Sequence, residues 1–367
     1  MSQLKQRLIE RIKSDGPITV AEYMTLCLLD PIDGYYPTRD PLGSDGDFIT
    51  APEISQMFGE VLGLWVIQSW EDLGSPKNIN IVELGPGRGI MMADMLRVAK
   101  LSPDFLNAIT VTLIEASAAL EAVQAKTLAD VSVPVRWIKD LSELSEGPMI
   151  LIGNEYLDCL PIRQFIQQDP FAGRAGWHER VVSLNKDEGL EFALSPAPIN
   201  KQLQASLPET QKDARKDQLL EISQSTQLLL SELKDRFDKN PGRALFIDYG
   251  PEETEFGDTL QALKRHKKIG VFDAPGDCDL TARVDFGTIK EFAENINLTV
   301  TAPIAQNQLL SRLGIEVRAV TLSKSNPSSK AKLTRQLERL MNHDQMGHLF
   351  KAICFQSKSL PPVLGFS

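Results

Sequence analysis

From residue 79 onward, short apolar runs alternate with longer stretches in which apolar residues recur every three or four positions. Short apolar runs predict buried strands, and the longer periodicity predicts amphipathic helices. The predicted strands are 79–84, 109–115, 133–138 and 149–154, and the predicted helices are 89–100 and 117–128. Because strands that alternate with helices form parallel βαβ units with right-handed crossovers, we expect an α/β fold with a parallel sheet.

The segments before and after this block follow other patterns. Helical periodicity near the start of the chain predicts helices at 3–13, 19–29 and 52–72. Strand-like runs lie at 161–168, 176–184 and 190–194, and turn residues separate them, which is typical of antiparallel strands. A helical stretch follows at 218–237. The alternation resumes with a strand at 244–248, so the α/β core contains an insertion.

We therefore expect the chain to have three parts. Residues 1–75 would form an N-terminal helical cap with a lid loop, and 161–240 a β-rich and helical insertion. Residues 76–160 and 241–367 would form a Rossmann-like core. The lid loop at 30–52 is rich in Gly, Pro and Asp, and long irregular segments of this kind inside compact proteins are usually functional or disordered.

Composition and charge exclude several classes of protein. The chain has 367 residues, 42% hydrophobic and 24% charged, as in ordinary globular proteins. Its net charge is −10 and it has no basic stripe, so no nucleic-acid partner is expected. No apolar run reaches the roughly 18 residues of a membrane-spanning helix, so no integral membrane contact is expected.

The same features bear on location and metal binding. Residues 1–13 lack the apolar core of a secretory signal, and the four cysteines lie far apart, which fits a reducing compartment. We predict a cytoplasmic protein, with the mitochondrial matrix as the less favoured alternative. The four histidines lack metal-ligand spacing, so no metal site is predicted.

The most informative motif is a glycine-rich turn between the first predicted strand of the core and its helix. Gly85, Gly87 and Gly89 lie in this turn. Glycines allow a sharp turn and a close approach of the backbone to a ligand, and the helix that follows points its N–H groups at that ligand. Because ligands of open parallel sheets bind beyond the carboxyl ends of the strands, we expect these glycines to bind a cofactor.

Two details of this motif favour one cofactor over another. A dinucleotide fingerprint has its last glycine where this chain has Ile90, whereas here the third glycine comes one position earlier. Glu83 lies two positions before the first glycine, where a carboxylate would repel a pyrophosphate and attract a cation. S-adenosyl-L-methionine carries a sulfonium and an amino group and no phosphate. The turn therefore favours S-adenosyl-L-methionine, with NAD and a turn without a ligand as the alternatives.

The ends of the second and third predicted strands supply two further candidates. Glu115 can accept hydrogen bonds from both ribose hydroxyls of a cofactor. This supports a nucleoside cofactor but does not distinguish S-adenosyl-L-methionine from NAD. Glu115 can equally be a charge at a helix N-terminus. Asp140 can reach an adenine amino group or simply cap a short helix.

The end of the fourth predicted strand is where a methyl acceptor would lie, beside the reactive carbon of the cofactor. Glu155 and Asp158 form an acidic cup there with the amide of Asn154 and the phenol of Tyr156. Paired carboxylates suit a cationic acceptor such as arginine. Alignment alone can lower the barrier of an in-line transfer by about 7–11 kcal/mol, more than a general base supplies. We therefore assign Asn154, Glu155 and Asp158 to orienting the acceptor first and removing its proton second, against the alternative of structural hydrogen bonds.

Six motifs together carry a family resemblance. They are 82–89 (Val-Glu-Leu-Gly-Pro-Gly-Arg-Gly), 154–161 (Asn-Glu-Tyr-Leu-Asp-Cys-Leu-Pro), 46–56, 176–180, 247–250 and 279–286. Over nearly the whole chain, the sequence resembles the MidA-like class I S-adenosylmethionine-dependent methyltransferases. In mitochondria this resemblance implies a protein-arginine methyltransferase needed for assembly of respiratory complex I, acting on a subunit of its quinone module. It also implies that Gly85, Gly87 and Glu115 hold the cofactor and that 154–158 faces the acceptor.

Other residues are assigned on weaker grounds. The resemblance implies that the segment with Asp47, Phe48 and Glu53 closes over the site as a lid, although packing and capping explain these residues equally well. Asp248 and Tyr249 end a returning strand on the ligand side, so we expect them to line the acceptor channel. The roles of three more residues stay open, namely His178, Asp279 and Asp285.

We therefore predict an S-adenosylmethionine-dependent methyltransferase that methylates arginine in a protein, either a complex I subunit or a bacterial equivalent. A cationic small molecule is an alternative acceptor. Two other functions are weighed: an assembly factor that binds the cofactor and holds a partner with little turnover, and an NAD-dependent oxidoreductase. The apolar helix at 52–72 and the insertion could each supply the face of a homodimer.

Overall fold

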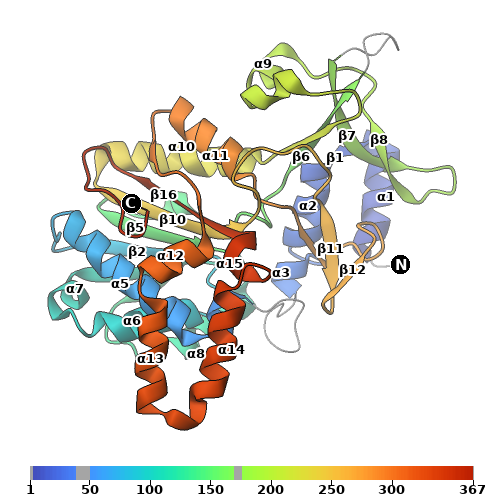
Figure 1. Cartoon of the computed structure of the whole chain (residues 1–367). Helices are drawn as coiled ribbons and strands as arrows, with labels where there is room; N and C mark the ends of the chain where they lie inside the picture. Colours follow the sequence, from blue (N-terminus) through green and yellow to red (C-terminus); the bar gives the residue numbers. More distant parts are fainter. Residues whose placement is uncertain (1–2, 39–49, 169–175, 367) are drawn as a thin grey trace.

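The computed structural model describes residues 3–38, 50–168 and 176–366. These residues form a larger lobe around one sheet and a smaller lobe of strands and N-terminal helices beside it (Figure 1). Among them, no helix combines the length and the apolar content needed to cross a bilayer.

The larger lobe contains an eight-stranded sheet in the order β14-β16-β10-β5-β2-β3-β4, with β15 also paired to β16. Five strands are parallel: β2 (Ile79–Leu84), β3 (Ile109–Ile114), β4 (Val135–Ile138), β5 (Met149–Asn154) and β10 (Gly242–Tyr249). Three are antiparallel to their neighbours: β14 (Thr299–Val300), β15 (Ile304–Ala305) and β16 (Phe350–Gln356). The chain runs outward from β2 to β4 and returns to β5 on the other side of β2, which creates a switch point between β2 and β5.

Helices cover both faces of this sheet because strand residues alternate between the faces. Along β10, for example, Leu245 and Ile247 join one apolar cluster, and Ala244 and Phe246 join the other. The first cluster is covered by α4 (Ala51–Ile54), α5 (Gln56–Asp72), α6 (Ile90–Ala99), α7 (Pro103–Ala108), α12 (Gln306–Arg312), α13 (Ile315–Ser325), α14 (Lys330–Met341) and α15 (Met346–Leu349).

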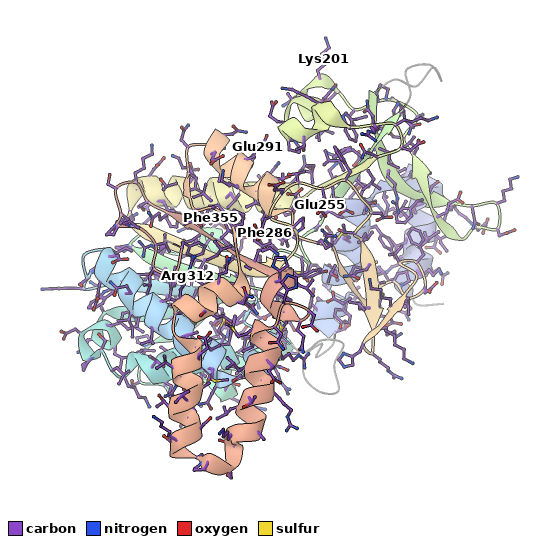
Figure 2. The ribbon with its side chains drawn as sticks, in the orientation of Figure 1. Lys201, Glu255, Phe286, Glu291, Arg312 and Phe355 are labelled. Atoms are coloured by element: carbon purple, nitrogen blue, oxygen red, sulfur yellow. The ribbon has the colours of Figure 1, made fainter. Side chains whose placement is uncertain are left out.

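The second face is covered by α10 (Gln224–Lys239) and α11 (Phe286–Asn295). Phe286 and Phe355 are buried in this cluster, whereas Lys201 extends into solvent from α9 (Lys201–Ala205) at the tip of the smaller lobe (Figure 2). Helix α8 (Ala118–Thr127) follows β3.

The smaller lobe joins the first residues of the chain to the insertion. Its helices are α1 (Gln3–Asp15), α2 (Val20–Leu29) and α3 (Tyr35–Thr38). An antiparallel sheet in the order β1-β7-β6-β9, with β8 on β7, consists of β1 (Ile18–Thr19), β6 (Arg163–Gln168), β7 (Gly176–Leu184), β8 (Leu190–Leu194) and β9 (Leu219–Ile222). A second sheet contains β11 (Gln261–Lys264), β12 (Lys267–Ile269) and β13 (Asp279–Thr281). Helices α1 and α2 share an apolar cluster with β7 and β13, whereas α5 packs on the main sheet.

Two predicted helices are wrong in part. The helix predicted at 52–72 is interrupted at Ser55, whose backbone is extended and whose side chain accepts a hydrogen bond from the N–H of Met57 to cap α5. The helix predicted at 218–237 begins as strand β9, which pairs with β6, and α10 starts only after Ser223. Tertiary pairing fixes β9, since Leu220 and Ile222 are buried in the core of the insertion.

Candidate functional site

A cavity of about 380 Å³ lies at the carboxyl ends of β2, β3, β4 and β5 and is lined by residues of both lobes. The loops after these strands form one side, and α2, α3 and β13 of the smaller lobe contribute to the other. Two basic residues line the cavity, Arg88 and Lys139. Seven carboxyl residues line it: Glu53, Glu83, Glu115, Asp140, Glu155, Asp158 and Asp279. This excess of acid favours a positively charged ligand.

The glycine-rich turn adopts the conformations that the sequence predicts. Gly85, Gly87 and Gly89 have φ values of 58°, 56° and 78°, which residues other than glycine rarely adopt. A Cβ on Gly85 would come within 3.0 Å of the ring of Tyr156. Gly85 and Gly87 line the cavity, whereas Gly89 caps the start of α6 and faces Gln124 instead.

Glu83 lines the cavity and is only 2% exposed. Burial raises its pKa from 4.5 to about 8. Its Oε2 atom has no hydrogen-bond partner among the residues that the structure describes. A cationic group bound beside it would supply that partner and return the pKa towards its ordinary value. The chemistry of this residue therefore fits a cofactor with an amino group and a sulfonium.

Glu115 is held in place by α8. Its Oε1 accepts a hydrogen bond from the N–H of Ser117 (2.7 Å), and its Oε2 accepts one from Nε2 of Gln124 (2.9 Å). Burial raises the pKa of Glu115, and these hydrogen bonds oppose the rise. The carboxylate lines the cavity at the end of β3 and retains lone pairs for further donors.

Gln124 is a site residue that the sequence did not reveal. It is fully buried, and its Nε2 also donates to the carbonyl of Gly87 (2.8 Å). Its Oε1 accepts a hydrogen bond from the indole of Trp137 (2.9 Å). One side chain thus connects the glycine-rich turn, Glu115 and β4. The available signal was a glutamine four positions after Leu120, on the buried face of a helix.

Asp140 does cap a short helix. It accepts a hydrogen bond from the N–H of Ser142 (2.9 Å), while Glu143 accepts one from the N–H of Asp140 (3.1 Å). The hydrogen bonds from Ser142 lower the pKa of Asp140. Asp140 also lines the cavity, so contact with an adenine stays a prediction.

Glu155 lines the cavity just after β5 and has a positive φ of 52°. Its Oε1 accepts hydrogen bonds from the N–H of Ala51 (2.9 Å) and from Nδ2 of Asn154 (3.1 Å). Burial raises its pKa from 4.5 to about 7. The start of α4, which brings Glu53 to the cavity, is thereby attached to the end of β5. Asp47 and Phe48, the other predicted lid residues, lie outside the described residues.

Asp248 shapes the acceptor turn without lining the cavity. Its Oδ2 accepts hydrogen bonds from the N–H groups of Tyr156 (3.1 Å), Leu157 (2.8 Å) and Asp158 (3.2 Å), and its Oδ1 accepts one from Tyr249 (2.9 Å). Burial raises the pKa of Asp248 to about 7, and these donors oppose the rise. Because β10 runs parallel to β5, this carboxylate reaches the turn that follows β5.

The remaining candidates are spread over the molecule. The hydroxyl of Tyr249 contacts Thr281 (2.9 Å) and does not line the cavity. Asp285 caps α11, and His178 is buried in the smaller lobe with Nδ1 2.9 Å from the carbonyl oxygen of Ser195. In contrast, Asp279 does line the cavity. Within the described ranges, no group of three or more His, Cys, Asp and Glu side chains is arranged to hold a metal ion.

Comparison with known sequences identifies the family. Residues 61–304 match the family model described as "Putative S-adenosyl-L-methionine-dependent methyltransferase". The chain belongs to this family. Its cofactor is therefore S-adenosyl-L-methionine, as the acid before the glycine-rich turn predicted, and the NAD alternative is set aside. The predicted resemblance and the class I methyltransferase fold with N-terminal helices and a β insertion are likewise confirmed.

Individual relatives align with most of the length of this methyltransferase. The mitochondrial protein arginine methyltransferase NDUFAF7 of Mus musculus is 36% identical over 374 aligned residues, covering 95% of this chain and 83% of that protein. NDUFAF7 of Homo sapiens is 37% identical over 376 aligned residues, covering 95% and 82%. A Burkholderia thailandensis protein, crystallised with bound S-adenosyl-homocysteine, superposes with a TM-score of 0.84 at 27% identity, covering 99% of this chain and 93% of that one.

Proposed function

We propose that this methyltransferase transfers a methyl group to an arginine side chain of a protein. The observation that carries the proposal is the acidic acceptor end of the cavity, where Glu155 and Asp158 follow β5, next to β2 and its glycine-rich turn. A guanidinium is planar, always charged and rich in N–H donors, so carboxylates in a partly buried site bind it well. The names of the curated relatives, protein arginine methyltransferases at 36–37% identity, support the same acceptor.

The residues at one end of the cavity bind the cofactor, and those at the other end bind the methyl acceptor. S-adenosyl-L-methionine, when bound, supplies an electrophilic methyl group on a positively charged sulfur. In the proposed arrangement, Glu83 accepts hydrogen bonds from its amino group, Glu115 accepts hydrogen bonds from ribose hydroxyls, and Gly85 and Gly87 leave room for it.

At the other end, Glu155 and Asp158 orient the guanidinium so that one nitrogen lies in line with the methyl group. Formation of the N–C bond accompanies cleavage of the S–C bond, whose electron pair stays on sulfur, and the arginine loses one proton. With its pKa raised to about 7, Glu155 is suited to accept that proton near neutral pH. Orientation contributes more than proton removal, because alignment alone lowers the barrier by about 7–11 kcal/mol.

The substrate protein is proposed to be a respiratory complex I subunit or its bacterial equivalent. The test uses complex I subunits from cells that lack the gene. These subunits are incubated with the purified enzyme and isotope-labelled S-adenosyl-L-methionine, and mass spectrometry compares them before and after the incubation. We expect label on arginine, and no label with Gly87→Val. Label on another residue type would contradict the arginine assignment. A partner that matures normally with Glu155→Gln although methylation has stopped would support the assembly-factor alternative.

A further inference from the structure

The acceptor end of the cavity is shared between the two lobes. Asp158 follows β5 in the larger lobe, and Asp279 begins β13 in the smaller one, yet both line the cavity. The N–H of Ala282, just after β13, donates a hydrogen bond to the carbonyl of Asp158 (2.9 Å). This backbone contact holds the two carboxyl residues at the same wall. Burial raises the pKa of Asp158, and the nearby charges of Asp248, Asp279 and Glu155 raise it further.

A buried acceptor atom lies at the same end of the cavity. Asn154 is 7% exposed and lines the cavity, and its Nδ2 donates a hydrogen bond to Glu155. Its Oδ1 has no hydrogen-bond partner among the described residues. A buried carbonyl oxygen without a donor is costly, so this atom indicates a ligand that brings an N–H or O–H group.

The orientation of Asp279 is set by a third element. The hydroxyl of Tyr36, on α3, donates a hydrogen bond to Oδ1 of Asp279 (3.1 Å). The ring of Tyr36 packs edge-on against Tyr35 at 5.3 Å between centroids, which fixes its position. Burial and the nearby acids raise the pKa of Tyr36, so the hydroxyl keeps its proton and remains a donor. Neither Tyr36 nor Asp279 has an assigned role.

We propose that Asp158, Asp279 and the side-chain oxygen of Asn154 form a guanidinium subsite in which Tyr36 positions Asp279. The inference rests on the arginine methylation proposed above and extends it, because the smaller lobe then supplies part of the acceptor site. A guanidinium offers five N–H donors in one plane and can meet two carboxylates and an amide oxygen together. An ammonium offers three donors around one point, so the subsite prefers arginine to lysine.

The test measures binding directly. Calorimetry would follow N-acetyl-arginine amide binding to the full-length protein saturated with S-adenosylhomocysteine, with N-acetyl-lysine amide as the comparison. We expect arginine amide to bind more tightly than lysine amide. Loss of a charged hydrogen bond should make binding about tenfold weaker or more in Asp279→Asn, and loss of a neutral donor about threefold weaker in Tyr36→Phe. The control Asp187→Asn, in the exposed β7–β8 turn, should match the wild type.

The outcomes separate this subsite from the proposed function. Wild-type methylation of arginine together with unchanged arginine-amide affinity in Asp279→Asn would overturn the subsite alone. Weakened binding in Asp279→Asn without any arginine methylation by the wild type would support the subsite and contradict the proposed function. S-adenosylhomocysteine affinity checks that each variant is folded. If Asp279→Asn fails this check, Tyr36→Phe decides: arginine-amide affinity equal to that of the wild type overturns the subsite as proposed, and a reduced one supports it.

Discussion

The two ends of the cavity are built in different ways. The cofactor end comes from successive loops of one sheet, within residues 83–140, and each loop follows its own strand. The acceptor end combines the turn after β5 with α3, α4 and β13, which are far apart in the sequence. A parallel sheet places successive loops at one edge by its topology. The acceptor end, in contrast, depends on how the smaller lobe packs against the larger one.

The largest expected effect tests the cofactor end. Gly85→Val places a β-branched residue at φ 58° and brings its Cβ against the ring of Tyr156. We expect about 100-fold weaker binding of S-adenosyl-L-methionine by calorimetry, because both strain and contact oppose the native turn. Gly257→Val, where a Cβ meets no atom within 4 Å, is the matched control. Equal affinities in the two variants would contradict a role for the turn in cofactor binding.

The next effect tests the acceptor end alone. Glu155→Gln removes a carboxylate that contacts the proposed guanidinium, and we expect kcat to fall about 30-fold with cofactor affinity unchanged. Since the pKa of Glu155 is raised to about 7, the carboxylate forms as pH rises through that value. Wild-type kcat should therefore increase across pH 6 to 8, and this increase should disappear in Glu155→Gln.

The control for that variant is Glu188→Gln. Glu188 also has a positive φ, 61°, but is exposed in the turn after β7. Its pH profile should match that of the wild type. A pH profile that is unaltered in Glu155→Gln would remove Glu155 from the proton transfer.

A smaller effect sharpens the description of the cofactor end. Gln124→Leu keeps the volume of the side chain but leaves Glu115 and the carbonyl of Gly87 without their shared donor. We expect the KM for S-adenosyl-L-methionine to rise about tenfold while kcat changes little. Gln6→Leu, on the exposed face of α1, is the control. A fall in kcat with an unchanged KM would show that Gln124 acts at the acceptor end instead.

The smallest effect concerns stability without cofactor. Glu83 has a pKa near 8 in the folded chain and an ordinary value of 4.5 when unfolded. Between these values the unfolded chain has released a proton that the folded chain retains, so stability falls as pH rises through this window. Glu83→Gln removes this loss. Its melting temperature should exceed that of the wild type by several degrees near pH 8 and by much less near pH 5. A difference that stays constant with pH would contradict the burial argument.

The cofactor end could be predicted from sequence because its determinants are local. Strand β2, the turn with Gly85 and the start of α6 follow one another within a dozen residues, and each has a composition signal. The contacts of Gln124 and Asp279 could not be predicted in this way, since a buried glutamine and a strand aspartate acquire their contacts only from tertiary packing. The strand at β9 and the break at Ser55 were missed for the same reason: pairing and docking overrode a helical pattern.

The last strand of the sheet has a consequence for how the enzyme is made. Strand β16 pairs with β10 along its whole length, from Arg243 opposite Gln356 to Tyr249 opposite Phe350. A ribosome must therefore translate the chain through residue 356 before β10 gains this neighbour. Until then the nascent chain carries an uncovered edge beside Asp248, the residue that anchors the acceptor turn, and such edges invite aggregation. Stalled or truncated products are expected to depend on chaperones and to lack methyl transfer, even though every cofactor-binding loop has already been synthesised.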